Sequence, residues 1–419
     1  MSPSLPAENR PLPQRFYSLD ALRGLASLSV VLFHWQNFFF EGTTFMPDRQ
    51  TCEPLYFALW PIYSQGKLAV EIFFTLSGFI FFWLYAQPIA DRKIRPREFF
   101  VLRFSRLYPL HFATLVFVMA AQWFVRARFG SFFVYTENDP FHFILHLFFA
   151  SNWGLEDAGL CFGLSLNAPV WSVSVEILLY VIFFLFCTAR LHRWWHLLLA
   201  AIVGGCLCTT SHPFIGRGIL SFFIGGLCFK LFSYVHERRK TSTFALASVG
   251  VLATWGMISF AIKHYDLYAI YHGLLGTRCV VFGHDIIGAA FLSLPSFPFH
   301  LPIVLILFPM TIVSLALLES SLGGMGKHLA FLGDISYSSY LLHFPLQLVF
   351  AALALQLGLD WTFFRSPAVL LLFFATLLPL SWLTYHYFEK PAQLYLRRRL
   401  GAAKVHRVDP TKAPHSSEN

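Results

Sequence analysis

Apolar residues dominate the stretch Leu19-Asp20-Ala21-Leu22-Arg23-Gly24-Leu25-Ala26-Ser27-Leu28-Ser29-Val30-Val31-Leu32-Phe33-His34-Trp35, and this stretch decides the fold of the chain. It opens an apolar run long enough to cross a bilayer. Arg23 and His34 lie eleven residues apart in it. That is about three helical turns, so both side chains share one helix face, with His34 about 16 Å further along the axis. An ionisable side chain inside a membrane span is costly and indicates a functional site.

The composition of the whole chain is that of a polytopic membrane protein. Of its 419 residues 56% are hydrophobic and 13% are charged, and the mean hydropathy is +0.59. A soluble globular protein carries about 25% charged residues. The net charge of +9 does not indicate nucleic-acid binding. Lys and Arg cluster between the apolar runs, where they set orientation and meet anionic headgroups.

Ten apolar runs are near the length of about 20 residues that crosses the hydrocarbon layer. We therefore predict an all-α, polytopic transmembrane helix bundle of about ten spans. Ten spans place both termini on one side, and the basic segments fall on that side too, so the positive-inside rule makes it cytoplasmic. Whether the shorter stretches 141–152 and 281–298 span or are re-entrant stays open. The predicted spans are 19–40, 66–86, 105–125, 170–189, 194–211, 216–235, 243–263, 300–318, 334–354 and 367–388.

The chain reads as one membrane domain without an appended soluble domain. We expect a cytoplasmic N-terminal segment over residues 1–18, the membrane domain over 19–391 and a disordered cytoplasmic tail over 392–419. The seven cysteines lack the spacing of metal ligands, so we expect no metal site. Cys52 and Cys161 fall in loops predicted to face outward, and the sequence leaves open whether they form a disulfide.

Two later spans each carry a stripe of polar side chains. Their spacings are i, i+4, i+8 and i, i+4, i+7, and both place the members of a stripe on one helix face. Such a face meets other helices or lines a cavity, and a carboxylate favours the cavity. The two stripes are Ser172, Glu176 and Tyr180, and Ser336, Tyr340 and His343.

Two further segments contain candidate site residues. Near the outer end of the second span, Glu71 either orients an imidazole or is hydrated, and Ser77-Gly78 are small residues where a ligand or another helix can approach closely. Arg103 and Arg106 are spaced i, i+3 at the cytoplasmic mouth of the third span, so they face the same way. Such a guanidinium pair either holds the anionic end of a nucleotide-like cofactor or binds lipid headgroups.

Each isolated ionisable group also has a structural explanation. Arg23 alone could extend to the headgroups, and His34 alone could be a hydrogen-bonded core histidine; their shared helix face favours a function. His386, Glu389 and Lys390 close the last predicted span, where we expect their polar ends to reach the interface.

Several motifs follow one another in a characteristic order. They are the Arg23 and His34 pair, Phe74-Thr75-Leu76-Ser77-Gly78-Phe79, Arg103 with Arg106, Trp171-Ser172-Val173-Ser174-Val175-Glu176, Ile335-Ser336-Tyr337 through His343, and Phe388-Glu389-Lys390-Pro391. In this order, over residues 19–391, they resemble the acyltransferase family 3 of integral membrane proteins. The resemblance implies a bundle of about ten helices that transfers acyl groups from acyl-CoA to extracytoplasmic glycans, glycolipids and some secondary metabolites.

The same resemblance implies site residues by position. Arg23 and His34 match the essential arginine and histidine of the family, and Arg103 and Arg106 match its paired arginines, which engage the CoA donor. We expect His34 to act as general base on the acceptor hydroxyl. Residues expected to line or support the cavity are Glu71, Ser77, Gly78, Trp171, Ser172, Glu176, Tyr340 and His343.

The resemblance further implies acyl-CoA, most simply acetyl-CoA, as co-substrate, with no bound cofactor. The expected partners are a carbohydrate or glycolipid acceptor and membrane lipids, and the expected location is the bacterial inner membrane. Two other protein classes fit the residues: a transporter or flippase, because buried His, Glu and Arg also build substrate paths, and, more weakly, a haem carrier with paired histidines. The sequence identifies neither the acceptor nor the acyl chain length.

Overall fold

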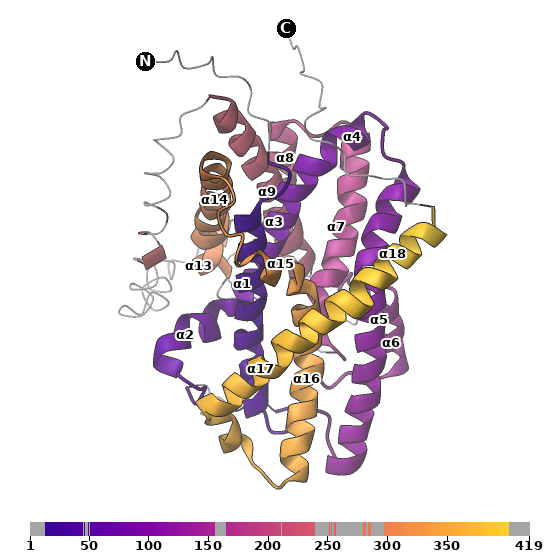
Figure 1. Ribbon diagram of the computed structural model, residues 1–419, viewed down its shortest axis with the longest axis vertical. Coiled ribbons are helices and arrows are strands. Elements are labelled where there is room, and N and C mark those ends of the chain that lie inside the picture. Colours follow the sequence, from indigo (N-terminus) through magenta and orange to yellow (C-terminus); the bar gives the residue numbers. More distant parts are fainter. Residues whose placement is uncertain are drawn as a thin grey trace.

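Helices form nearly all the regular structure in the described part of the protein, shown as a computed structural model in Figure 1. The structure describes residues 13–401 without positions 45, 47, 48, 50, 156–164, 211, 239–250, 252, 254, 257–279, 282, 283 and 286–296. The predicted all-α class is confirmed. The described strands, β1 (Val280–Val281) and β2 (His284–Asp285), form one short antiparallel pair.

The helices are of three kinds. The α-helices are α1 (Tyr17–Phe33), α2 (Tyr56–Gln65), α3 (Ala69–Leu84), α4 (Ala86–Ala90), α5 (Pro96–Phe129), α6 (Pro140–Leu147), α7 (Trp171–Thr188), α8 (Trp194–Leu207), α9 (Pro213–Arg238), α13 (Phe297–Pro302), α14 (Phe308–Leu322), α15 (Ala330–Asp334), α16 (Ser336–Gln356), α17 (Pro367–Thr384) and α18 (Lys390–Arg399). The 3₁₀ segments are η1 (His34–Phe39), η3 (Gly66–Leu68), η4 (Ala168–Val170) and η6 (Trp361–Arg365). The π-helical segments are η5 (Ile303–Leu307) and η7 (Tyr385–Glu389).

Seven helical stretches among the described residues are long and apolar enough to cross a membrane, which supports a multi-pass membrane protein. The first predicted span corresponds to α1 with 17 residues followed by η1, and the fifth to α8 with 14 residues. The predicted span 243–263 lies largely outside the described residues, so ten spans remain a prediction. The seven stretches are Tyr56–Leu84, Pro96–Phe129, Ala168–Thr188, Pro213–Glu237, His300–Leu322, Ser336–Gln356 and Pro367–Arg399.

Two expectations about short segments are settled. The stretch 141–152 does not span, because α6 has only eight residues, about 12 Å of helix. The expectation of disorder from residue 392 is wrong for the first part of the tail, because η7 runs directly into α18. In α18, Arg397 Nε donates to Ser105 Oγ on α5 at 3.3 Å. Residues 402–419, Cys161 and most of 281–298 lie outside the described residues.

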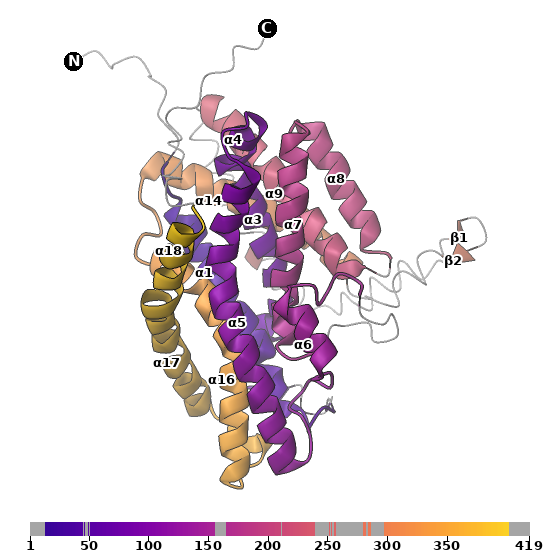
Figure 2. The ribbon, with the colours of Figure 1, turned by 90° about the vertical axis from the view of Figure 1, so that its right-hand side faces the viewer.

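The ends of the bundle are well separated along its long axis. Figure 1 shows α4 at one end and the connection between α16 and α17 at the other. Figure 2 shows α17 and α18 on the opposite side of the molecule from α8, with α5 between them. The helices that enclose the candidate site are α1, α3, α5, α7 and α16.

Backbone contact between α3 and α9 holds the centre of the core together. A Cβ atom on Gly78 would lie 1.9 Å from the carbonyl oxygen of Phe222, and one on Gly225 would lie 2.0 Å from that of Thr75. Only glycine permits such an approach. Gly78 therefore serves helix packing, and its neighbour Ser77 is left to face the candidate site.

The start of α1 is anchored by a carboxylate from a distant helix. Glu319 of α14 accepts hydrogen bonds from the backbone N–H groups of Tyr17 and Ser18, both at 2.8 Å, and from Ser18 Oγ at 2.6 Å. These bonds satisfy donors that a helix N-terminus leaves free. They also hold Arg23, one turn further along α1, at a fixed depth in the bundle.

Candidate active site

Five helices enclose a cavity of about 120 Å³ that gathers most of the predicted site residues. Both predicted stripes face it in part, because Ser172, Glu176 and Tyr180 line it from α7, and Ser336 and Tyr340 line it from α16. All three residues of the first stripe thus face the cavity, whereas in the second stripe only Ser336 and Tyr340 line it and His343 lies beyond Tyr340. Other polar residues that line the cavity are Arg23, Ser77, Arg103, Arg106 and Tyr337.

The three arginines enter one end of the cavity and differ in their partners. Arg23 Nη2 bonds Asp20 at 2.8 Å and the carbonyl oxygen of Gly333 at 2.9 Å. Arg103 donates from Nη2 to the Tyr85 hydroxyl at 2.6 Å. Among the described residues, the buried Nε of Arg103 has no hydrogen-bond partner, and Arg106 makes no hydrogen bond. Guanidinium donors are thus available to an anionic ligand.

A single carboxylate accompanies these positive charges on the cavity wall. The Tyr180 hydroxyl donates to Glu176 Oε1 at 2.5 Å, and Ser77 Oγ lies 3.5 Å from the same oxygen. Glu176 is therefore held by its own helix and by α3 rather than by an arginine within ion-pair distance. Three arginines against one glutamate leave the wall positively charged.

The opposite end of the cavity is closed by aromatic and hydroxyl side chains. Helices α1, α5 and α16 run away from the arginine end, and α3 and α7 run towards it, so the last lining residues are Phe73, Ser172 and Tyr340. The Tyr340 hydroxyl donates to the carbonyl oxygen of Pro169 and accepts from Ser172 Oγ at 2.8 Å. Tyr340 is buried, and these two hydrogen bonds fix the position of its hydroxyl group.

Two imidazoles lie one helical turn beyond Tyr340. The rings of His34 and His343 have their centroids 5.0 Å apart, and the His343 ring is 5.8 Å from that of Tyr340. His34 Nδ1 bonds the Val30 carbonyl oxygen at 2.9 Å, and His343 Nδ1 bonds that of Tyr340 at 2.5 Å. Because a carbonyl oxygen only accepts, each Nδ1 carries a proton, and in a neutral ring each Nε2 is an acceptor.

Hydrogen bonds continue outward from His34. Gln347 Nε2 donates to the His34 carbonyl oxygen at 2.8 Å, and Asn37 Nδ2 donates to Gln347 Oε1 at 3.0 Å. This network stabilises the change from α1 to η1, which occurs at His34. His34 is half-buried, whereas His343 is fully buried.

Some predicted residues do not line the cavity. Glu71 is not exposed to water and, among the described residues, bonds no imidazole: it is fully buried and accepts from Arg217 of α9 at 2.6 Å. Trp171 lies under the same guanidinium, with the Arg217 Cζ atom 5.0 Å from its ring centroid. The sequence analysis missed Arg217, although it is an arginine inside a predicted span, the same signal that identified Arg23.

The end of the last span also differs from expectation. His386 is exposed as predicted, with its Nδ1 bonded to the Trp382 carbonyl oxygen at 2.9 Å. Glu389 does not reach the interface: it is 4% exposed and accepts from Ser338 Oγ of α16 at 2.7 Å. Glu389 belongs to the π-helical segment η7, whose wider turn changes which side chains face α16. This bond holds α16 next to the cavity.

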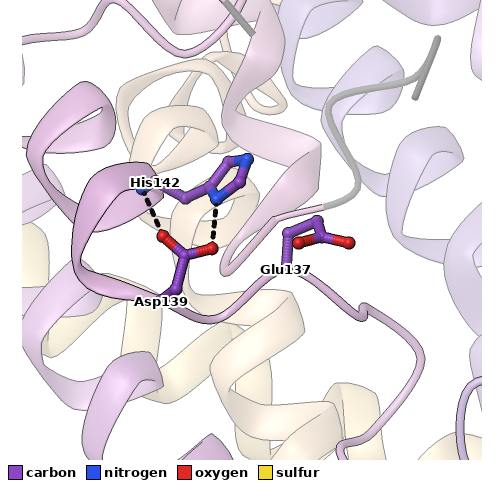
Figure 3. Close-up of side chains that lie close together, drawn as sticks. All are labelled: Glu137, Asp139 and His142. Atoms are coloured by element: carbon purple, nitrogen blue, oxygen red, sulfur yellow. Dashed lines mark hydrogen bonds and ion pairs between the residues drawn. The ribbon is translucent and has the colours of Figure 1, made fainter. Parts of the chain in front are cut away.

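A separate cluster of Glu137, Asp139 and His142 lies beside α6 (Figure 3). Asp139 caps that helix by accepting from the backbone N–H groups of Phe141 and His142, and its other oxygen bonds His142 Nδ1 at 2.5 Å. Partial burial acts to raise the pKa of Asp139, but the bonds from His142 outweigh it and lower this pKa below its usual range. Helix capping therefore accounts for the arrangement.

Comparisons with known proteins match the chain to acyltransferases. A family model described as an acyltransferase domain matches residues 16–386. Protein 2 in the picA locus of Rhizobium radiobacter is 31% identical over 180 residues, which are 41% of this chain and 82% of that protein. The acyltransferase MdmB of Streptomyces mycarofaciens is 34% identical over 102 residues, which are 24% of this chain and 23% of that protein. No solved structure matches the chain.

The family match begins just before α1 and ends within η7, so it includes every helix that lines the cavity. The order of motifs along the chain, the apolar helices and the family match lead to one conclusion. The chain belongs to the acyltransferase family 3 and is a multi-pass membrane acyltransferase.

Proposed function

We propose that the protein transfers an acyl group, most simply acetyl, from cytoplasmic acyl-CoA to a hydroxyl group of a carbohydrate or glycolipid on the outer side of a bacterial plasma membrane. One observation carries this proposal. The cavity has a cluster of guanidinium groups at one end and a pair of imidazoles just beyond the other. A donor bound by its phosphates at the first end would extend its thioester towards the second.

The arginine end suits the phosphates of CoA. Arg106 has no hydrogen-bond or ion-pair partner among the described residues, and Arg103 has one nitrogen without a hydrogen-bond partner. Guanidinium groups bind phosphate oxygens through paired N–H donors, and a low-dielectric wall strengthens this attraction. Arg23, bonded to Asp20 and to a backbone oxygen, is positioned to orient the donor rather than to provide the main anchor.

The imidazole end suits base catalysis of acyl transfer. His34 Nε2 takes the proton of the acceptor hydroxyl while the hydroxyl oxygen attacks the thioester carbonyl carbon. The tetrahedral intermediate then collapses as the carbon–sulfur bond breaks, and the imidazolium returns the proton to the CoA sulfur. The products are an ester and free CoA, so that atoms and charge balance.

Exposure distinguishes the two histidines. His34 is half-buried, so an acceptor hydroxyl can approach its Nε2. His343 is fully buried, and its Nε2 has no hydrogen-bond partner among the described residues. We therefore assign the base to His34 and assign to His343 the positioning of that ring from 5.0 Å away.

The proposal is tested in membranes of the native host with the gene deleted and restored. Labelled acetyl-CoA is added, and label is measured in the carbohydrate and lipid fractions. Removal of a general base lowers a rate by about 10²–10⁴-fold, so we expect His34→Ala to abolish transfer while the protein stays at normal abundance. Arg103→Ala with Arg106→Ala should raise the KM for acetyl-CoA more than it lowers kcat.

Each assignment has its own contrary result. Activity of His34→Ala at the wild-type rate would remove the base assignment, and an unchanged KM in the double arginine variant would remove the phosphate site. If glycan crosses proteoliposome membranes without any acyl-CoA, the protein is a transporter. Mass spectrometry of surface glycans with and without the gene should reveal the loss of one acyl mass and identify the acceptor.

A further inference from the structure

Two aromatic rings line the end of the cavity that is nearest the imidazoles. Phe73 of α3 and Tyr340 of α16 are the outermost lining residues of their helices, and their ring centroids are 5.9 Å apart in an edge-to-face arrangement. His343 follows Tyr340 by one turn of α16. We propose that Phe73 and Tyr340 form a filter that admits a short acyl group and excludes a longer one. This inference rests on the proposed use of an acyl-CoA donor.

The Tyr340 side of this pair is rigid. Its hydroxyl is held by Ser172 of α7 and by the carbonyl oxygen of Pro169 in η4, and its ring is 5% exposed. A rotation that widened the passage would break both bonds inside the core, where an unmade hydrogen bond is costly. Space for an acyl group beside Tyr340 is therefore determined by the size of residue 73.

The side chain at position 73 is the part of the filter whose size a substitution can change. Phe73 is half-buried, and its ring packs against Tyr340. From Phe81 at the arginine end to Phe73, α3 rises about 12 Å, so an extended donor arm would carry its acyl end to this pair. The whole cavity is small, at about 120 Å³. Each methylene added to the acyl chain must then displace wall atoms of a close-packed interior.

Binding of CoA thioesters tests the filter without knowledge of the acceptor. The probes are CoA, acetyl-CoA, butyryl-CoA and hexanoyl-CoA, each competing with labelled CoA for the purified full-length protein in detergent. We expect the wild type to bind CoA and acetyl-CoA within about threefold of each other, and the two longer thioesters at least tenfold more weakly. Phe73→Ala should bring all four within about threefold.

Further variants keep the test sharp if Phe73→Ala does not fold. Phe73→Leu should restore butyryl-CoA binding at least in part, and Phe73→Trp should retain CoA but weaken acetyl-CoA at least tenfold. Phe124→Ala is the control, because Phe124 is 52% exposed on α5 and does not line the cavity. It should leave the order of affinities unchanged.

The outcomes separate the filter from the proposed function. The filter is overturned if the wild type binds all thioesters equally. It is also overturned if variants at position 73 still bind CoA and keep the same chain-length limit. Either result leaves the donor assignment standing. If the wild type binds neither CoA nor any thioester, the donor assignment fails, and the filter fails with it.

Discussion

The charged side chains inside the bundle are mostly held by specific partners. Glu71 and Arg217 pair at 2.6 Å, with 1% and 11% of their side chains exposed. Trp171 covers the guanidinium, and Trp171 is followed directly by Ser172, which bonds Tyr340. The pair therefore supports the part of the cavity wall formed by Ser172 and Tyr340, which is a positioning role.

Removal of one partner should destabilise the protein strongly. Glu71→Ala leaves an uncompensated buried guanidinium, and a broken buried pair costs about 3–5 kcal/mol. We expect a clear fall in the thermal unfolding midpoint of the purified protein in detergent. The matched control replaces both partners by methionine, which should recover most of the loss. If the single and double variants are equally unstable, the pair itself does not account for the effect.

The burial of Glu53 predicts that the stability of the protein depends on pH. It lies before α2 and is 6% exposed, and burial raises its pKa from 4.5 to about 7. A group whose pKa is higher in the folded protein than in the unfolded chain stabilises the folded state. This contribution is fully present at pH values below the pKa of the group in the unfolded chain. That contribution is lost as the pH rises from about 4.5 through about 7.

The measurement compares wild type and Glu53→Gln between pH 5 and pH 8. The unfolding midpoint of the wild type should fall with rising pH relative to that of the variant, because an amide cannot ionise. Parallel curves for the two proteins would show that Glu53 does not titrate in this range.

Among the helices, α3 combines two functions on opposite faces. Gly78 and its neighbours contact the backbone of α9, whereas Phe73, Ser77 and Phe81 line the cavity. Close packing on one face therefore sets the distance of the other face from α16. The sequence showed that small residues occur here, and the structure shows that packing is the role of Gly78 and that the cavity is the place of Ser77.

Gly78→Ala should disrupt this packing. Its Cβ would lie 1.9 Å from the carbonyl oxygen of Phe222, so α3 and α9 must separate. We expect a loss of about 1–3 kcal/mol in stability, typical of overpacking, or a failure to accumulate in the membrane. Gly205→Ala on α8 is the control, because its nearest neighbour lies 4.0 Å from the added Cβ. Equal thermal stability of both variants would contradict this account of the crossing.

For the whole molecule, the decisive property is orientation in the membrane. Figure 1 places α4 and the connection between α16 and α17 at opposite ends of the long axis. The positive-inside rule assigns the α4 end, which carries Arg92, Lys93 and Arg95, to the cytoplasm. Under the proposed function, this orientation would turn the arginine end of the cavity towards the cytoplasmic acyl-CoA donor.

Cysteine labelling tests this orientation. In a background without native cysteines, Lys93→Cys should resist a membrane-impermeant maleimide in intact cells and react after lysis, because the positive-inside rule assigns it to the inner side. Asp360→Cys, in the loop before η6, should react in intact cells. Both positions are exposed, so burial does not determine the result. The reverse pattern would show that the protein has the opposite orientation in the membrane and would rule out the donor assignment.

The sequence alone determined the helical class, the membrane setting and the faces of individual helices. These properties are local, because apolar length and the 3.6-residue period act along one segment at a time. The stripe of Ser172, Glu176 and Tyr180 could therefore be assigned correctly before any partner was known. The shared face of Arg103 and Arg106 follows from the same period, and both line the cavity.

Only the tertiary structure decided which faces meet. Nothing local indicates that Glu71 pairs with Arg217, 146 residues away, or that Glu389 bonds Ser338 rather than reaching the interface. The location of His34 beyond Tyr340 likewise depends on the packing of α1 against α16. Such contacts join residues far apart in the chain, and their energies depend on how the helices cross. A periodic pattern within one helix therefore does not predict them.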